Sequence, residues 1–254
     1  MAPTIRYIFL TAWRDRMFWV LLVGILAAGI IAHMLGATAP TSTRELTVSY
    51  SSNAARAMIV LGLIIFVCSH LHNAFNTHEI DVFLSRPITR TKLILSYWVG
   101  FAYVALIHGG AVILLLGVQD VVNWDGFIAW SVSLLLECFM VVAIALFSSF
   151  TLKSNVASVL ASLGFYILAR MMAFFIAATA TAFIFEKAWL NSIIIDSLKA
   201  VSIMMPRLDF FGHDEWLIDG VKHIADMELF TLQAVIFIPL LILATMADFN
   251  RKQF

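Results

Sequence analysis

Charged residues are scarce in this chain of 254 residues. Asp, Glu, Lys and Arg make up 13% of it and hydrophobic residues 62%, whereas soluble domains carry about a quarter charged residues. The 16 basic and 16 acidic residues cancel to a formal net charge of zero, so no basic surface for nucleic acid is expected. The composition therefore predicts an integral membrane protein in contact with the lipid bilayer.

Sequence motifs of common enzyme and redox sites are also missing. The two cysteines, Cys68 and Cys138, lie in apolar runs and have no C-x-x-C spacing, which argues against a disulfide or a cysteine metal site. Both are expected to pack as small hydrophobic residues. The chain contains no H-E-x-x-H, G-x-S-x-G or G-x-x-x-x-G-K-[ST] sequence, so an intramembrane enzyme is the least favoured class and no bound cofactor is predicted.

Long apolar runs divide the chain. A bilayer core of about 30 Å requires roughly 20 mostly apolar residues per helix. Six stretches meet this length, namely residues 17–35, 57–75, 93–117, 127–150, 156–184 and 229–247. The first is too long for a cleaved signal peptide and lacks an A-x-A-like cleavage site. We therefore expect one all-α domain over residues 1–254 with six transmembrane helices.

The distribution of Lys and Arg predicts the orientation, because cytoplasmic flanks of membrane helices carry an excess of them. With the N-terminus inside, nine lie on the cytoplasmic side: Arg6, Arg14, Arg16, Arg86, Arg90, Lys92, Lys153, Arg251 and Lys252. Six lie outside: Arg44, Arg56, Lys187, Lys199, Arg207 and Lys222. We expect both termini in the cytoplasm, as in a multi-pass protein of a bacterial inner membrane.

An amphipathic helix is predicted over residues 3–14, before the first span. Its apolar residues recur at helical spacing, at Ile5, Ile8, Phe9, Ala12 and Trp13. We expect this helix to lie in the cytoplasmic interface of the bilayer. The alternative is a continuation of the first span, and the sequence Arg14-Asp15-Arg16 argues for a break instead.

Two outer segments are expected to differ in structure. Residues 36–56, rich in Thr and Ser, are expected to form a loop. Residues 186–228 are expected to cap the bundle with two short helices separated at Pro206. The first of these could enter the lipid as a re-entrant element covered by other helices, and the second would be N-capped by Asp214.

The second cap helix would carry acidic and His side chains on one face. Glu215, Asp219, His223 and Asp226 fall at i, i+4, i+8 and i+11. Such side chains can bind a transition metal. A solvated acidic face is the favoured interpretation, and Gly220 within the helix weakens the metal hypothesis further, so no metal is predicted.

The most informative segment is the charged stretch over residues 76–92, between the second and third spans. Ile80, Phe83 and Leu84 share one face of a predicted short cytoplasmic helix. Pro87 disfavours helix at the preceding residue, and Thr89 can then cap the helix that leads into the third span. A short helix with a defined exit could follow a partner docked beneath it and pass movement to both neighbouring spans.

This segment carries a family resemblance. The pattern Glu79-x-x-x-x-Leu84-Ser-Arg-Pro-Ile-Thr-Arg90, followed by Leu-Ile-Leu-Ser and Gly100, resembles that of the type-2 permease family of ATP-binding-cassette transporters. The interfacial helix, the six spans and the two outer helices resemble the same family. Tyr97 departs from it, since Lys is frequent in that helix. The Met205-Pro-Arg-Leu-Asp-Phe-Phe211 stretch further resembles members associated with multicopper-enzyme maturation.

The resemblance implies partners and a docking surface. It implies a permease homodimer or heterodimer with two copies of a cytoplasmic ATPase, which would hold the ATP and Mg. Residues 76–92 would be the coupling surface, through Glu79, Asp81, Phe83, Leu84, Arg86, Pro87 and Arg90. Because this chain has no P-loop, ATP hydrolysis would belong to the partner.

Two charges are predicted inside the membrane. Glu137 lies near the middle of the fourth span and Arg170 near the middle of the fifth, and a charge at the bilayer centre costs about 2.5–3.5 kcal/mol. An ion pair between them is expected, either as part of a gate or as a buried bond that fixes helix register. No other polar residue is expected to cluster with this pair.

Three functions remain open from the sequence. The first is the permease of an ATP-driven exporter that moves a lipid, glycan, peptide or small amphiphile outward. The second is an ATP-driven mechanical module that acts on a periplasmic or membrane partner and transports nothing. The third is an ATP-independent channel or secondary transporter, which would need more polar residues at mid-membrane than the sequence predicts.

Overall fold

The computed structural model describes residues 2–38, 43–84, 89–119, 123–181, 196–197, 205–221 and 224–251. In these residues the chain is helical and contains no strand, so the predicted all-α class is confirmed. The helices are α1 (Ala2–Arg14), α2 (Arg16–Ala37), α3 (Thr43–Asn76), α4 (Glu79–Leu84), α5 (Arg90–Gly117), α6 (Trp124–Thr151), α7 (Asn155–Arg170), α8 (Met172–Thr181), η1 (Leu208–Phe210), α10 (Glu215–Asp219) and α11 (Ile224–Arg251).

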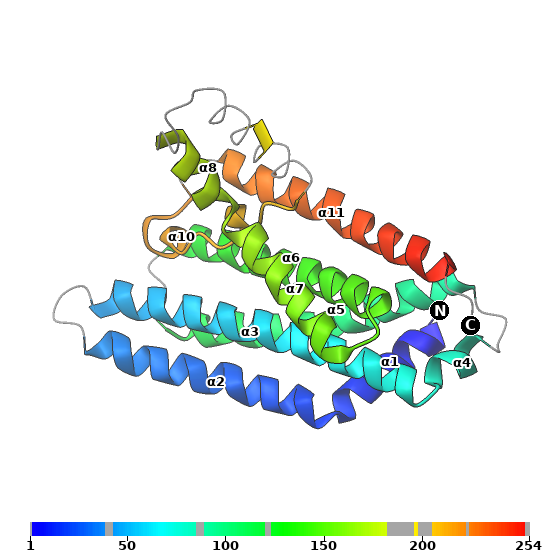
Figure 1. Cartoon of the computed structure of the whole chain (residues 1–254). Coiled ribbons are helices and arrows are strands. Elements are labelled where there is room, and N and C mark those ends of the chain that lie inside the picture. Colours follow the sequence, from blue (N-terminus) through cyan, green and yellow to red (C-terminus); the bar gives the residue numbers. More distant parts are fainter. Residues whose placement is uncertain are drawn as a thin grey trace.

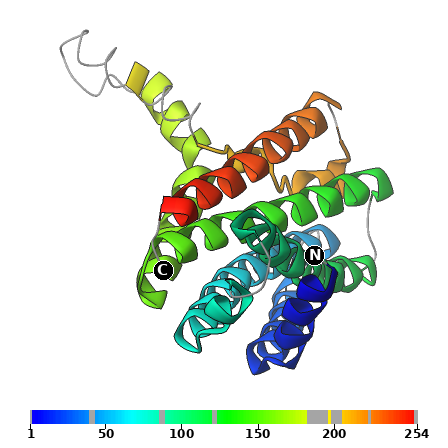
Figure 2. The same ribbon diagram turned by 90° about the vertical axis from the view of Figure 1, so that its right-hand side faces the viewer.

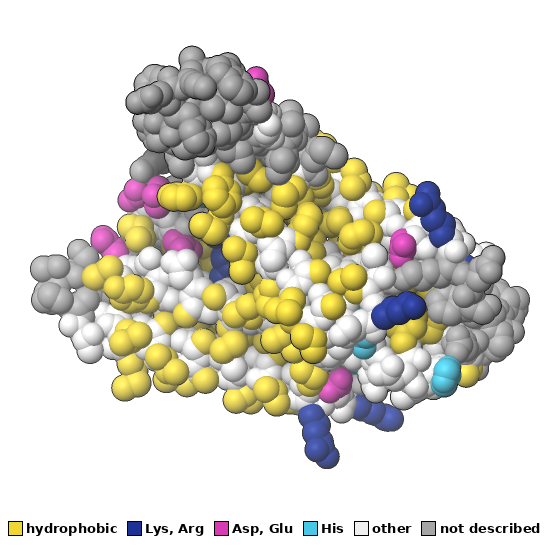
Figure 3. Space-filling model, viewed as in Figure 1, with side chains coloured by type: hydrophobic (Ala, Val, Ile, Leu, Met, Phe, Trp, Pro, Cys, Tyr) yellow, Lys and Arg dark blue, Asp and Glu magenta, His cyan; other side chains and the backbone are white. Residues whose placement is uncertain are grey.

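Five of the described helices are long and apolar enough to cross a membrane, namely α2, α3, α5, α6 and α11. Their most apolar windows have mean hydropathies of 2.1 to 2.3. Hydrophobic side chains cover most of the face seen in Figure 3 between the two ends of the bundle. The chain is therefore a multi-pass membrane protein by length and composition.

The run predicted as the fifth span, residues 156–184, contains two helices. Helix α7 ends at Arg170 after 16 residues, and α8 begins at Met172. Met171 between them has φ −86° and ψ 3°, outside the α-helical range, and α8 diverges from the axis of α7 (Figure 1). The described part of this predicted span is therefore interrupted at Met171.

Helix α6 is the centre of the bundle. It packs against α3, α5, α7, α10 and α11, and Figure 2 shows it between α11 and the α2–α3 pair. Trp130, Leu134 and Cys138 on α6 are fully buried. Both chain termini and α4 lie at one end of the bundle, called here the termini end, and η1 and α10 lie toward the other, the far end (Figure 1).

Helices α2 and α3 form a close antiparallel pair. A Cβ atom at Gly36 would overlap the Thr47 hydroxyl oxygen, and one at Gly62 would overlap a Leu21 methyl carbon. Glycine at such positions lets two membrane helices approach closely. This packing keeps α3 helical from Thr43, so the loop predicted over residues 36–56 is wrong for most of its length.

Helix α1 covers the predicted segment 3–14 and is separated from α2 at Asp15. Asp15 is extended (φ −69°, ψ 133°), and its Oδ1 accepts a 3.0 Å hydrogen bond from the Met17 backbone N–H. The predicted break is therefore confirmed, and its cause is an N-cap. Ile8 and Ala12 are buried in the packing of α1 on α5, so part of the apolar face meets protein.

Candidate functional site

A buried ion pair joins α3 to α6 near the middle of both helices. Glu137 on α6 is fully buried, and its Oε2 lies 2.6 Å from Nη1 of Arg56 on α3. The Arg56 guanidinium also lies 4.9 Å from the centre of the Trp130 ring, a cation–π contact. The sequence interpretation placed Arg56 in the segment before the second span; in the structure it lies within α3, 13 residues after the start of the helix.

The predicted partner, Arg170, reaches the same carboxylate from α7. Its Nη1 lies 3.4 Å from Glu137 Oε1, and the Tyr166 hydroxyl donates to Oε1 at 2.7 Å. These four residues, Arg56, Glu137, Tyr166 and Arg170, are called the charge cluster below. The expectation that no other polar residue joins Glu137 and Arg170 is therefore wrong. The Glu137 carboxylate accepts from three side chains, which offsets the cost of its burial.

An irregular segment packs against the charge cluster. Arg170 Nη1 donates to the backbone carbonyls of Leu208 at 2.9 Å and Phe211 at 2.6 Å. The Gly212 N–H donates to the Ser133 hydroxyl at 3.3 Å. Gly212 has φ 75°, and a Cβ there would overlap the Arg56 guanidinium, so only glycine fits without strain.

This segment, residues 205–221, extends along α6 toward the middle of the bundle. Near the start of α6, a Cβ on Gly126 would meet the Trp216 carbonyl. Glu137 lies eleven residues further along α6, or about 16 Å. Non-helical backbone at membrane depth is stable only when protein covers it and its polar groups are satisfied. Arg170 donates hydrogen bonds to two backbone carbonyls of this segment. This gives its charged side chain a structural role.

Asp214 ties the segment to the bundle from a second side. The predicted helix start is confirmed, because Asp214 is the N-cap residue of α10, but its side chain makes no cap bond. Its Oδ1 instead accepts from the Ser52 hydroxyl at 2.9 Å and from Trp130 Nε1 at 3.1 Å. The charge cluster and Asp214 together join α3, α6 and α7 to residues 208–214.

A groove adjoins the charge cluster between α3 and α7. Its volume is about 280 Å³, and it is lined by Asn53, Arg56, Ala57, Val60, Leu61, Leu163, Tyr166, Ile167 and Arg170. Within the described structure, Nε and Nη2 of Arg56 are buried and have no hydrogen-bond partner. The groove therefore combines an apolar wall with guanidinium donors.

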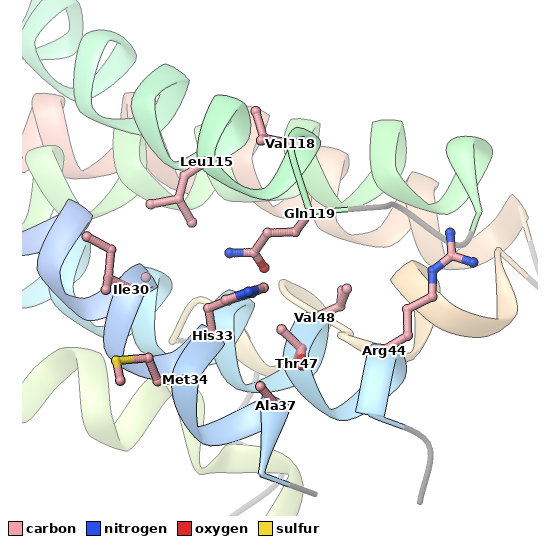
Figure 4. A pocket seen from close by; sticks show the side chains of 11 residues that line it. Ile30, His33, Met34, Ala37, Arg44, Thr47, Val48, Leu115, Val118 and Gln119 are labelled. Atoms are coloured by element: carbon pink, nitrogen blue, oxygen red, sulfur yellow. The ribbon is translucent and has the colours of Figure 1, made fainter.

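A larger pocket of about 800 Å³ lies between α2, α3 and α5 toward the far end. Figure 4 shows His33 from α2 and Gln119, just after α5, pointing into it, with Leu115 on its apolar wall. The buried Gln119 Oε1 has no hydrogen-bond partner in the described structure. Its size and mostly apolar lining are typical of small-molecule sites, and Arg44 is the charged residue in its lining.

At the termini end, the predicted coupling segment contains helix α4. Glu79 begins it, Ile80 is buried, and His78 before it has φ 57°. Arg86 and Pro87 lie outside the described residues, as do the side chains of Asp81, Phe83 and Leu84. The predicted cap is confirmed: the Lys92 N–H donates to the Thr89 hydroxyl at 3.4 Å, and α5 begins at Arg90.

Aromatic side chains pack behind this segment. Phe150 on α6 has ring-centre distances of 5.1 Å to Phe249, 5.5 Å to Phe75 and 6.3 Å to Tyr97. These four residues, the aromatic cluster below, join α3, α5, α6 and α11. Arg90 Nη1 donates to the Phe249 carbonyl at 3.0 Å and links the start of α5 to the end of α11.

The metal hypothesis loses its geometric basis. Helix α10 ends at Asp219, and Gly220 has φ 78°, so Glu215 and Asp219 do not continue into one helix with Asp226. His223 lies outside the described residues. In the part of the chain that the structure describes, no three His, Cys, Asp or Glu side chains form a group that could hold a metal ion.

The two cysteines and His108 are packing residues. Cys68 and Cys138 are both free and buried, as the sequence predicts. His108 is fully buried, and its ring nitrogens lie 2.9 Å and 3.1 Å from the backbone carbonyl oxygens of Val104 and Phe18. Such a ring links α5 to α2 and is not free to act as a metal ligand.

Comparison with known proteins adds no assignment. No protein-family model matches this chain, and none of the curated proteins matches it. The features of the molecule that bear on function are therefore the two clusters, the groove and the termini end.

Proposed function

We propose that this chain is the membrane-spanning permease subunit of an ATP-driven exporter and that a separate cytoplasmic ATPase supplies the energy. The observation that carries the proposal is the position of α4. It is a short helix at the termini end, connected to the long helices α3 and α5 (Figure 1). A surface helix held by two membrane helices is suited to receive movement from a docked partner.

Charge supports the proposed orientation. Lys and Arg side chains gather at the termini end on the face seen in Figure 3, and cytoplasmic flanks carry an excess of these residues. In our proposal this end faces the cytoplasm, both termini are inside, and α7 with α8 forms a sixth crossing. The membrane would be a bacterial inner membrane, with two permease chains and two ATPase copies per transporter.

The aromatic cluster gives a route for the movement. Tyr97 and Phe75 lie on the two helices that flank α4, and Phe150 and Phe249 connect them to α6 and α11. Arg90 fixes the first turn of α5 to the last turn of α11. A displacement of α4 would therefore be passed to four long helices. The cargo would be a lipid, glycan, peptide or small amphiphile.

The test has two stages. Affinity purification of the intact protein from its native membrane should recover a nucleotide-binding chain of about 25–35 kDa, the size of one or two small domains. Glu79→Ala and Arg90→Glu should then leave that complex assembled but lower transport-linked ATPase activity. Lys153→Glu is the control, because Lys153 is exposed on the α6–α7 turn and lies outside α4. Wild-type coupling in both variants would refute the proposal.

A mechanical module that acts on a periplasmic partner is the second candidate. The observation that favours it is the bonding of residues 205–221 to α3, α6 and α7, which would relay a movement of the bundle to the outer surface. Exchanging the exposed Glu215 and Asp219 for Lys should then release an outer partner while membrane extraction stays normal. Cargo-stimulated ATPase activity in the purified complex would favour the exporter.

A further inference from the structure

We propose that the groove between α3 and α7 binds the anionic headgroup of a membrane lipid through Arg56 and Arg170. The proposal begins from an imbalance of charge. Two guanidinium groups of the charge cluster share one carboxylate, that of Glu137. Both arginines line the groove, so an anion placed there would pair with the guanidinium groups that share Glu137.

Unused hydrogen-bond donors strengthen this inference. The Arg56 side chain is 4% exposed, yet its Nε and Nη2 have no partner within the described protein. Burying such donors without acceptors is unfavourable. The planar guanidinium presents donors in a fork that fits two oxygens of a phosphate or carboxylate. Because Arg56 lines the groove, we infer that an anionic headgroup there supplies an acceptor that the described protein does not.

The remaining walls favour a lipid over a free anion. Leu61 and Ile167 are exposed, apolar residues that line the groove on membrane-embedded helices. The volume of about 280 Å³ equals roughly nine water molecules at ~30 Å³ each, which suits a headgroup but not its chains. Acyl chains would lie along the exposed apolar faces of α3 and α7. An inorganic anion would have to cross that apolar surface.

As a binding site, the groove requires only that these helices lie in a bilayer. Its use as a substrate site rests on the proposed transport function. A binding experiment without ATP or ATPase therefore separates the two: headgroup binding can be present even if no partner ATPase exists, and its absence leaves the coupling experiment unaffected.

The test uses the full chain in phosphatidylcholine nanodiscs with a photoactivatable phosphatidylglycerol probe. We expect the wild type to crosslink this probe about tenfold more efficiently than the matching phosphatidylcholine probe, as expected when one charge-assisted interaction is gained. Ala57→Trp should reduce the preference to about parity, because Ala57 is exposed and lines the groove. Ala27→Trp is the matched control, since Ala27 is exposed on α2 outside the groove.

A second variant tests the arginine itself without changing the net charge of the cluster. The double substitution Arg56→Gln with Glu137→Gln removes one charge of each sign. The side chain at position 56 then no longer offers a fork of donors, so the preference for the phosphatidylglycerol probe should fall several-fold. Excess inorganic phosphate should leave crosslinking unchanged. Equal crosslinking of both probes by the wild type would overturn the proposal and indicate that water satisfies Arg56. Competition by phosphate, or equal loss of preference in Ala27→Trp, would overturn it as well.

Discussion

The charge cluster and the aromatic cluster both include α3 and α6, and they hold their helices together by different physics. The charge cluster joins α3, α6 and α7 through bonds of fixed direction, including the 2.6 Å contact between Arg56 and Glu137. The aromatic cluster joins α3, α5, α6 and α11 through ring contacts of 5.1 to 6.3 Å between ring centres. Directional bonds fix one arrangement, whereas ring contacts allow helices to shift without exposing polar groups.

The difference assigns roles to the two regions. Removing one partner of a buried ion pair costs about 3–5 kcal/mol, whereas an aromatic pair contributes about 0.5–1.5 kcal/mol beyond its buried area. The charge cluster therefore sets the geometry of the irregular segment 205–221. The aromatic cluster, next to α4, is the region where movement is less costly. The following substitutions test this contrast, from the largest expected effect to the smallest.

Glu137→Ala should have the largest effect. It leaves the buried Arg56 and the half-buried Arg170 guanidinium groups without their carboxylate. It should lower the free energy of unfolding by about 3–5 kcal/mol, measured by denaturant unfolding in detergent micelles. The double substitution Arg56→Leu with Glu137→Leu should be less destabilising than Glu137→Ala, since it removes the pair together. Equal losses in both variants would show that packing, not charge, holds this region.

Gly212→Ala should cost roughly 2 kcal/mol or more. An alanine at φ 75° is strained by about 1–2 kcal/mol, and its Cβ would displace the Arg56 guanidinium from Glu137. Thermal unfolding of the purified protein is the measurement. Gly110→Ala is the control, since no atom lies within 4 Å of its added Cβ. A normal melting temperature for Gly212→Ala would mean that the segment is not held against Arg56.

Phe249→Leu should cost about 1 kcal/mol, because it removes the ring contact with Phe150 and keeps most of the apolar volume. Its main effect should be a loss of coupled ATPase activity, whereas the main effect of Gly212→Ala should be a loss of stability. Phe174→Leu on α8 is the control, because Phe174 is 63% exposed. Loss of stability with intact coupling would remove the aromatic cluster from the proposed route.

Thr89→Ala should have the smallest effect. The cap bond to the Lys92 N–H is long, at 3.4 Å, so the loss should be about 0.5 kcal/mol, the low end for an N-cap. Hydrogen exchange at the first turn of α5 should rise locally, while exchange near Glu137 stays unchanged. Rapid exchange at both places would show that the two regions are not separable.

Features that depend on residues close together in the sequence could be predicted from it. The apolar runs predicted a membrane protein and the positions of α2, α5, α6 and α11, because the length of an apolar run can be read directly from the sequence. The cap at Thr89 and the break at Asp15 follow from contacts within three residues. The docking role of residues 79–90 stays a prediction.

Only the tertiary structure decided which groups meet. Arg56 and Glu137 are 81 residues apart, and their contact depends on how α3 and α6 are rotated against each other, which no local pattern encodes. Gly212 and Asp214 reach the cluster only because residues 205–221 pack along α6. The sequence determined that charges lie within apolar helices, where they need partners. Helix packing determined which partners they have.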